Sequence, residues 1–395
     1  MKRWFSNADR IDMFDFDTKI ERKNSGSEKY DRLKKLYADE DVISMWVADM
    51  DFSIAPCIDK AIKKRSLHPI YGYPSYPQAL YDSIISWIER RHSWSIKKEW
   101  LTFSPGVLAS LNLAVQSLTK ENSTILIQTP VYPPFFNAAT DNNRKLLTNP
   151  LVLRNGRYEI DFTDLDNKLR ESSMLVISNP HNPTGTLFTE DELKEVVSLC
   201  DNHDVILFSD EIHSDIVFSK FTPAASVGKH SHIITAQSPS KTFNLAGLSS
   251  SFNIISNDDM RKKVRDSLNR LHISTINQYG IVAMQEAYSC AEPWLEELKT
   301  YLSKNIKTAS DFFRDTPIKM TQPEATYLLW LDCSSLNLTP KELHEFFAKS
   351  AKLGLSAGHT FSKDYAQFMR MNVALPHSEL VRALNQLEVA LKAAT

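Results

Sequence analysis

The chain has 395 residues, and its 46 Lys+Arg against 48 Asp+Glu give a formal net charge of −2 at pH 7. This length supports one large or two medium domains with a buried core. It excludes a small domain that depends on disulfides or a metal for its stability. The near balance of charge gives no electrostatic attraction to nucleic acid or to an anionic membrane, so a small-molecule ligand is the expectation.

The cysteines predict neither a metal site nor a disulfide framework. Cys57, Cys200, Cys290 and Cys333 lie far apart, with no Cys-x-x-Cys spacing. We therefore expect reduced thiols and no structural zinc. The N-terminus has no apolar region typical of a secretion signal, and no run of about 18 apolar residues occurs. These patterns predict an unexported, cytoplasmic protein.

Between residues 58 and 288, short β-rich runs alternate with helical patterns. The apolar runs STILIQTP, SMLVISNP, DVILFSDE and HIITAQSPS are each typical of a buried strand. The segment GVLASLNLAVQSL has apolar residues at helical spacing, and TEDELKEVVSLCDNH begins with a capping-box pattern at Thr189 and Glu192. Alternation of this kind predicts an α/β fold with a mostly parallel central sheet flanked by helices.

Downstream, the pattern changes to that of a smaller α+β domain. We predict a long helix in EPWLEELKTYLSKNIKTASDFF, a strand in TYLLWLDC and a capped helix in TPKELHEFFAKSA. The last helix, in LVRALNQLEVALKAA, has one apolar face, formed by Leu380, Leu384, Leu387 and Leu391. We predict a large domain over residues 56–289 and a small domain formed by residues 1–55 together with 290–395.

Polar and aromatic side chains follow four of the predicted strands. Tyr132 follows the first strand, and Asn182 follows the second. Asp210 and His213 follow the third strand, and Lys241 follows the fourth. Because ligands of open parallel sheets bind beyond the carboxyl ends of the strands, we expect these residues to converge on one site.

A lysine and an acid at one sheet edge suit pyridoxal 5′-phosphate (PLP). This cofactor needs a lysine for a Schiff base, a carboxylate at its ring nitrogen and a site for its phosphate. Lys241 and Asp210 supply the first two. The candidate phosphate donors are Gly106 and Val107 at the start of a predicted helix, and the hydroxyls of Ser238 and Ser240. Each residue alone also fits a structural role such as a cap, a turn or the core, so the prediction depends on their joint occurrence.

Two other patterns deserve comparison. Ser238 and Lys241 match the S-x-x-K pattern of penicillin-interacting serine enzymes, but the SDN and KTG companions of that class are replaced by SDE and KTF.

Glycine is scarce, with ten residues in the chain. Gly106, Gly185 and Gly247 are therefore candidates for backbone positions that other residues cannot occupy.

The motifs YGYP, SPGV, TPVYPPF, NPHNPTG, SDEIH and SPSKTFNLAGL, with WVADMDF and MRMNVALP, resemble those of fold-type-I PLP enzymes. Within that class the chain is similar to the MalY/PatB group of cystathionine β-lyases and cysteine C-S lyases, which includes cystalysin. The likeness runs from about Phe14 to the C-terminus. The likeness to this group depends on the motifs occurring together, since NPxNPTG and SxSK alone mark only the wider aminotransferase class.

The resemblance implies a role for each matching residue. Lys241 would form the Schiff base and then remove the substrate Cα proton, Asp210 would pair with the pyridine nitrogen, and Asn182 would bind the ring hydroxyl. Tyr132 would stack on the ring and take part in catalysis. Tyr73 would reach the phosphate of the neighbouring subunit, which makes the active form a homodimer.

The resemblance also implies how phosphate and substrate are held. Gly106, Val107 and Ser238 would bind the phosphate. Arg370 would bind the substrate α-carboxylate as a bidentate fork, a geometry that guanidinium provides and an ammonium group does not. Asn182 and the backbone at Ala48 would line the same pocket.

Two positions favour the lyase branch over ordinary aminotransferases. His213 stands where aminotransferases commonly have tyrosine, and Ser249 stands where they commonly have arginine. The resemblance thus implies cleavage of L-cystathionine to homocysteine, pyruvate and ammonia, with cysteine, cystine and S-alkyl cysteines as other substrates. The alternatives are a class I/II aminotransferase and a regulatory protein that has kept the cofactor fold. The segment GHTFSKDYAQFMR departs from the family, which usually has further glycines after Gly358.

Overall fold

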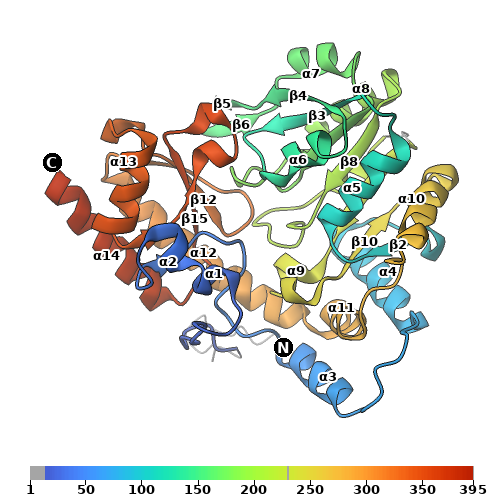
Figure 1. The fold of residues 1–395 in the computed structure, drawn as a ribbon, viewed down its shortest axis with the longest axis horizontal. Helices are drawn as coiled ribbons and strands as arrows, with labels where there is room; N and C mark the ends of the chain where they lie inside the picture. The colour runs from blue at the N-terminus through green and yellow to red at the C-terminus, as the bar shows by residue number, and fades with distance from the viewer. Residues whose placement is uncertain (1–13, 229–230, 395) are drawn as a thin grey trace, which may run out of the picture.

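A seven-stranded sheet forms the centre of the larger part of the chain (Figure 1). The computed structural model describes residues 14–228 and 231–394. The strands lie in the order β2 (Leu101–Ser104), β10 (Ser251–Ile254), β9 (Ile233–Gln237), β8 (Ile206–Asp210), β7 (Met174–Ser178), β3 (Thr124–Thr129) and β4 (Lys145–Pro150). The four strands predicted from apolar runs are β3, β7, β8 and β9, and they are neighbours in this sheet.

The sheet is mostly parallel, which confirms the predicted fold class. The pairs β4–β3, β3–β7, β7–β8 and β8–β9 are parallel, whereas β10 runs antiparallel to both β9 and β2. Because β3, β7, β8 and β9 point the same way, the segments that follow them emerge at one edge.

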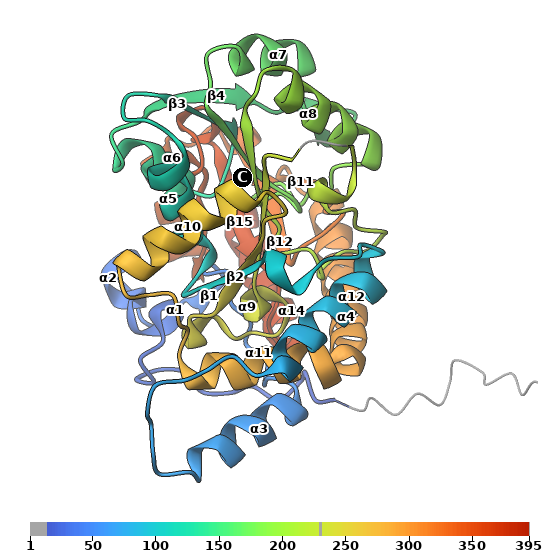
Figure 2. The ribbon, with the colours of Figure 1, turned by 90° about the vertical axis from the view of Figure 1, so that its right-hand side faces the viewer.

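Helices cover both faces of this sheet (Figure 2). On one face lie α5 (Val107–Leu118), α6 (Pro134–Thr140) and α10 (Asp258–Arg270), whose apolar residues form one core with the strands. On the other face lie α7 (Phe162–Leu169) and α8 (Glu190–Asn202). The predicted capping box is present, since Thr189 Oγ1 accepts from the Glu192 N–H at 3.2 Å and the Glu192 side chain accepts from the Thr189 N–H at 2.7 Å. A short hairpin, β5 (Val152–Arg154) and β6 (Arg157–Glu159), extends the chain beyond β4.

A second, antiparallel sheet is formed by β11 (Lys319–Thr321), β12 (Leu328–Asp332), β15 (Phe368–Asn372) and β14 (Ser356–Ala357). The helices of this part are α12 (Glu292–Arg314), α13 (Pro340–Glu345) and α14 (His377–Ala394). The chain continues from α13 into one π-helical turn, Phe346–Ser350. The predicted apolar face of α14 is buried at Leu380, Leu384, Leu387 and Leu391.

The N-terminal segment joins this second part. Strand β1 (Ile43–Ser44) pairs in parallel with β13 (Leu353–Gly354), and two short helices, α1 (Glu28–Asp31) and α2 (Leu33–Tyr37), precede it. The remaining helices are α3 (Pro56–Ser66), α4 (Gln78–His92), α9 (Pro239–Thr242) and α11 (Gln278–Cys290). The proposed division at residues 55/56 and 289/290 stays a prediction, and residues 1–13 of its first segment lie outside the described residues. None of the described helices is long and apolar enough to cross a membrane.

The expectation of four reduced cysteines is wrong in the structure. Cys57 on α3 and Cys290 at the end of α11 form a disulfide, with their Cα atoms 6.6 Å apart, while Cys200 and Cys333 are free and buried. The two bonded cysteines are 233 residues apart, so no local spacing could reveal the pair. The expected cytoplasmic location depended partly on all four thiols being reduced, and the disulfide removes that support.

The glycine predictions had different outcomes. Gly185 has a φ of +72°, and an added Cβ would lie 2.7 Å from Cβ of Pro323, so this position requires glycine. The expectations for Gly106 and Gly247 are wrong, because neither φ lies in the left-handed region and an added Cβ at either position would meet no protein atom within 4 Å.

Candidate active site

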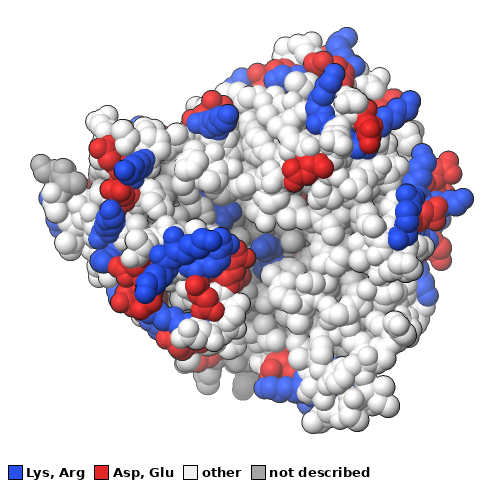
Figure 3. All heavy atoms as spheres, viewed as in Figure 1, with Lys and Arg blue, Asp and Glu red and all other residues white. Residues whose placement is uncertain are grey.

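A cavity of about 760 Å³ opens at the carboxyl ends of β7, β8 and β9 and is closed on its other side by the small sheet. In Figure 3 it is seen as a hollow in the surface, with Lys and Arg atoms visible inside it. The predicted site residues that line it are Ala48, Gly106, Val107, Tyr132, Asn182, Asp210, His213, Ser238, Ser240, Lys241 and Arg370. The structure therefore brings together every predicted site residue except Tyr73.

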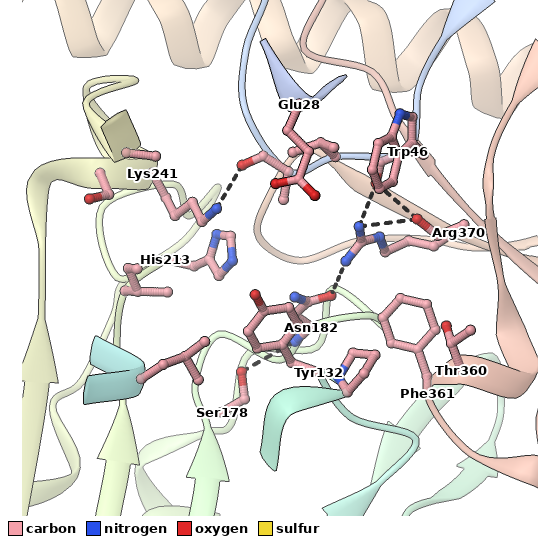
Figure 4. Close-up of a pocket in the computed structure, with 18 of the residues that line it drawn as sticks. Glu28, Trp46, Tyr132, Ser178, Asn182, His213, Lys241, Thr360, Phe361 and Arg370 are labelled. Carbon is pink, nitrogen blue, oxygen red and sulfur yellow. Dashed lines mark hydrogen bonds between the residues drawn. The ribbon is translucent and has the colours of Figure 1, made fainter. Parts of the chain in front are cut away.

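Lys241 reaches into the cavity from α9, the short helix that follows β9. Its Nζ donates to the carbonyl oxygen of Ala48 at 2.9 Å (Figure 4). Burial lowers the pKa of this amine to about 8, and the positive charge of Arg370 acts in the same direction, against the opposite effects of Asp49 and Asp210. A lysine with so low a pKa is a competent proton acceptor near neutral pH.

Asp210 is the last residue of β8, and its carboxylate faces the cavity. The N–H of Ile212 donates to its Oδ1 at 3.0 Å. Burial raises the pKa of this carboxyl to about 7, although that hydrogen bond and the charge of Lys241 lower it. Glu211 instead accepts from the Ala224 N–H at 3.0 Å and does not line the cavity. Asp210 is thus the carboxylate that this strand end presents to a ligand, and a cationic group would relieve the cost of its burial.

Arg370, in β15, one of the two inner strands of the small sheet, enters the cavity from the side opposite Lys241. Its Nη1 donates to Asn182 Oδ1 at 2.9 Å, and its Nη2 donates to the Trp46 carbonyl oxygen at 2.6 Å (Figure 4). Its carbon Cζ lies 4.9 Å from the ring centroid of Phe361. The Nε of this buried guanidinium has no partner among the described residues. A carboxylate ligand would supply the missing acceptor.

Tyr132, Asn182 and His213 complete the polar lining between Lys241 and Arg370 (Figure 4). Since Asn182 Oδ1 accepts from Arg370, its amide nitrogen is the group left to donate to a ligand oxygen. Burial lowers the pKa of His213 to about 3, so the imidazole is neutral at physiological pH. Its Nδ1 has no partner within the described chain.

The start of α5 offers backbone donors to an anion. Gly106 is the N-cap residue of this twelve-residue helix, and Val107 is its first residue. An added Cβ on Gly106 would meet no protein atom within 4 Å, so the position is open toward the cavity. Ser238 caps α9, where its Oγ lies 2.7 Å from Ser240 Oγ and 2.6 Å from the carbonyl oxygen of Ser250. A helix start flanked by hydroxyls is suited to a phosphate group.

The serine-lysine alternative is not supported by these contacts. Ser238 Oγ is bonded to the Ser250 carbonyl, and Lys241 Nζ is bonded to the Ala48 carbonyl. A lysine can activate a serine nucleophile only if the serine hydroxyl and the lysine amine are hydrogen-bonded to each other. The contacts of Ser238 are those of a helix cap.

Sequence reasoning missed the support that the N-terminal segment gives to the site. The Ala48 carbonyl accepts from Tyr327 Oη at 2.9 Å as well as from Lys241. Behind it, the buried Lys29 donates to Asp51 Oδ2 at 2.9 Å, and Arg22 donates to Asp51 Oδ1 at 2.6 Å. Acidic residues in the motif WVADMDF were the available signal, but their cationic partners lie 20 or more residues earlier.

Tyr73 lies outside the cavity of its own chain. Its relative exposure is 105%, in the connection between α3 and α4, where Leu67, Ile70 and Tyr71 are also exposed. Figure 1 shows this connection at the edge of the molecule, away from β8. The cross-subunit role of Tyr73 stays a prediction.

The glycine-poor segment after Gly358 forms two short 3-10 turns, Gly358–Thr360 and Lys363–Tyr365. A Cβ on Gly358 would collide with the carbonyl oxygens of Tyr365 and Phe368, so this glycine is needed for close packing rather than for positive φ. His359, Thr360 and Phe361 line the cavity. This segment therefore builds part of the entrance without further glycines.

Comparison with known proteins agrees with this geometry. Cystathionine beta-lyase PatB of Bacillus subtilis (strain 168) is 38% identical over 95% of this chain and 99% of that protein. The crystal structure of cystalysin from Treponema denticola, which contains a pyridoxal 5′-phosphate cofactor, has a TM-score of 0.94 and 32% identity, and the match covers 97% of this chain and 100% of that one. The PLP-bound C-S lyase from Staphylococcus hominis has a TM-score of 0.89 and 33% identity, covering 96% of this chain and 98% of that one.

The resemblance to the MalY/PatB group is confirmed by these relatives. The family model of aminotransferase class I and II matches residues 40–387, which include the cavity residues from Trp46 to Arg370. With this match and these relatives, the chain belongs to the aminotransferase class I and II family.

Proposed function

We propose that this protein is a PLP-dependent carbon-sulfur β-lyase that cleaves L-cystathionine and related cysteine S-conjugates to a thiol, pyruvate and ammonia. Its relatives include proteins named cystathionine β-lyase and C-S lyase. The observation that carries the proposal is that Lys241, Asp210 and Arg370, from three separate elements, face one cavity. A lysine, a carboxylate and a fork-shaped carboxylate binder are the groups this chemistry needs.

The residues present fit PLP. The buried carboxylate of Asp210 would pair with the ring nitrogen, the amide nitrogen of Asn182 would donate to the ring oxygen, and Lys241 would attach to the aldehyde. The phosphate would lie at the start of α5, near Ser238. When bound, PLP supplies an electron-accepting ring that stabilises negative charge at the substrate Cα.

The chain's own groups account for binding and proton transfer. The Arg370 fork would hold the substrate α-carboxylate, using the Nε that lacks a partner. Lys241 Nζ, with its lowered pKa, would take the Cα proton. The electron pair left at Cα would then form a Cα–Cβ double bond as the Cβ–S bond breaks with its own pair on sulfur. The thiolate would take up a proton, and water would hydrolyse the three-carbon enamine to pyruvate and ammonia. Neutral His213 and Tyr132 would pack beside the reacting atoms without adding charge.

The test is to add L-cystathionine to the cofactor-loaded protein without any keto acid, and to assay free thiol and pyruvate together. We expect equal amounts of the two products. If neither forms, and turnover begins only when a keto acid is supplied, the protein is an aminotransferase and the lyase proposal fails.

We further propose a homodimer in which Tyr73 completes the phosphate site of the partner subunit. The full exposure of Tyr73, beside exposed Leu67, Ile70 and Tyr71, supports a covered interface there. The test mixes two inactive variants, Lys241→Ala and Tyr73→Phe. A mixed dimer has one site with an intact lysine and an intact partner tyrosine, so activity should return. No recovery after verified subunit exchange would contradict the proposal.

A further inference from the structure

Glu28 is an acidic residue at the cavity that neither the predicted site nor the proposed reaction uses. It is the first residue of α1 and lines the cavity. Figure 4 shows its carboxylate directed into the cavity, in this view between Lys241 and Arg370. Its side chain is 63% exposed, so it stands at the solvent end of the site.

The position of Glu28 is fixed by its neighbour in the chain. The Lys29 carbonyl accepts from Ser44 Oγ at 2.7 Å and from Trp46 Nε1 at 3.0 Å. The Lys29 side chain is buried and ion-paired to Asp51. These contacts attach α1 to the same segment whose carbonyls bind Lys241 and Arg370. The backbone at Glu28 is therefore anchored to the segment that contacts Lys241 and Arg370.

One carboxylate stands at the outer, solvent-facing part of the cavity. Among the described lining residues, Glu28 and Asp210 are the carboxylates, and Asp210 lies buried at the inner end. Arg32 binds one oxygen, Oε1, of Glu28, which leaves Oε2 to accept from another donor. Burial is the main cause of the raised pKa of Tyr132, and the charges of Asp210 and Glu28 act in the same direction, Glu28 with the smallest effect.

We propose that Glu28 selects cysteine S-conjugates whose leaving thiol carries an ammonium group, by accepting a hydrogen bond from that group. The inference rests on the proposed function. With the α-carboxylate at Arg370 and Cα at Lys241, the chain beyond sulfur extends toward the open end of the cavity. The leaving parts of L-cystathionine and L-cystine are themselves amino acids and carry this ammonium, whereas simple S-alkyl cysteines do not.

The catalytic test compares S-(2-aminoethyl)-L-cysteine with S-propyl-L-cysteine, in which a methyl group replaces the ammonium. We expect Glu28→Gln to lower the ratio of their kcat/KM values about fivefold, which corresponds to about 1 kcal/mol, with S-propyl-L-cysteine unaffected. Glu28→Lys should lower the ratio further. The matched control is Glu195→Gln, an exposed glutamate on α8, which should leave the ratio unchanged. An unchanged ratio in Glu28→Gln, or an equal loss with both substrates, would overturn the inference.

A binding measurement separates this inference from the proposed reaction. L-lysine and L-norleucine have no leaving group at Cβ, so their dissociation constants from the cofactor-loaded protein do not depend on C–S cleavage. We expect Glu28→Gln to weaken L-lysine about fivefold and to leave L-norleucine unchanged. If this occurs in a protein that releases no thiol, the ammonium site stands and the lyase proposal fails. If thiol is released but Glu28→Gln leaves the dissociation constant of L-lysine unchanged, the lyase proposal stands and the ammonium site fails.

Discussion

Replacing Arg370 by lysine keeps a positive charge in the cavity but removes the planar fork. The guanidinium is buried and holds Asn182 and the Trp46 carbonyl through its two terminal nitrogens, while its Nε lacks a partner. An ammonium group cannot reproduce the three separate nitrogen donors that guanidinium holds in one plane, so it can bind the substrate carboxylate through one contact at most while it keeps the others. We therefore expect Arg370→Lys to weaken substrate recognition.

The expected magnitude follows from the lost contact. A hydrogen bond to a charged group contributes about 1.5 to 3 kcal/mol, and burial of Arg370 argues against screening by solvent. A loss of about 2 to 3 kcal/mol corresponds to a decrease of roughly 30- to 150-fold in kcat/KM. The lysine variant should retain its cofactor absorbance, because Lys241 and Asp210 are unchanged.

The assay compares S-propyl-L-cysteine with its carboxamide, S-propyl-L-cysteinamide, in both proteins. The wild type should prefer the carboxylate strongly, and the variant should lose most of that preference while its kcat/KM for the carboxamide changes little. An unchanged preference would refute the assignment of Arg370. A variant that lost cofactor absorbance would instead identify Arg370 as a structural support for the cofactor site.

Three further changes test other parts of the site. Lys241→Ala should abolish turnover and the absorbance of the protein-bound cofactor; borohydride-reducible cofactor on another lysine would show that the wrong lysine was chosen. In the cofactor-free protein, Lys241→Met should raise the free energy of unfolding, because burial lowers the folded-state pKa of Lys241 from 10.5 to about 8. The free-energy cost of burying the charged amine is complete below pH 8 and vanishes as the pH rises to 10.5. Denaturant titrations should therefore show that the gain in the free energy of unfolding is about 2 kcal/mol larger at pH 7 than at pH 10. A pH-independent gain would contradict the lowered pKa of Lys241. Lys29→Met should lower the free energy of unfolding by about 2 to 3 kcal/mol by leaving Asp51 with Arg22 alone, whereas the control Lys23→Met, at an exposed ion pair with Asp41, should cost less than about 0.5 kcal/mol.

The inner part of the site could be predicted because its residues follow buried strands. Asp210 and Lys241 come after apolar runs that are readable as strands, and parallel strands end at one edge whatever the rest of the fold does. Of the two neighbouring acids at this strand end, Asp210 lines the cavity and Glu211 does not. The apolar runs and this one topological rule were sufficient to predict that Asp210 and Lys241 lie at the same site.

The outer part could not be predicted in the same way. Glu28 and Lys29 belong to a helix of four residues, which is too short to show a periodic pattern. Their position depends on contacts with Trp46 and Asp51, which only the folded chain brings close. Strand β10 and its antiparallel direction were not predicted either.

The bond between Ala48 and Tyr327 has a consequence for how the reacting lysine moves. In the proposed reaction Lys241 changes partners during each turnover, and a buried carbonyl that lost its only donor would resist that movement by about 1 to 3 kcal/mol. The Ala48 carbonyl has two donors, Lys241 and the buried hydroxyl of Tyr327. Because the tyrosine stays when the lysine leaves, the carbonyl never lacks a partner. The second donor thus lets the lysine be well placed at rest and still free to depart.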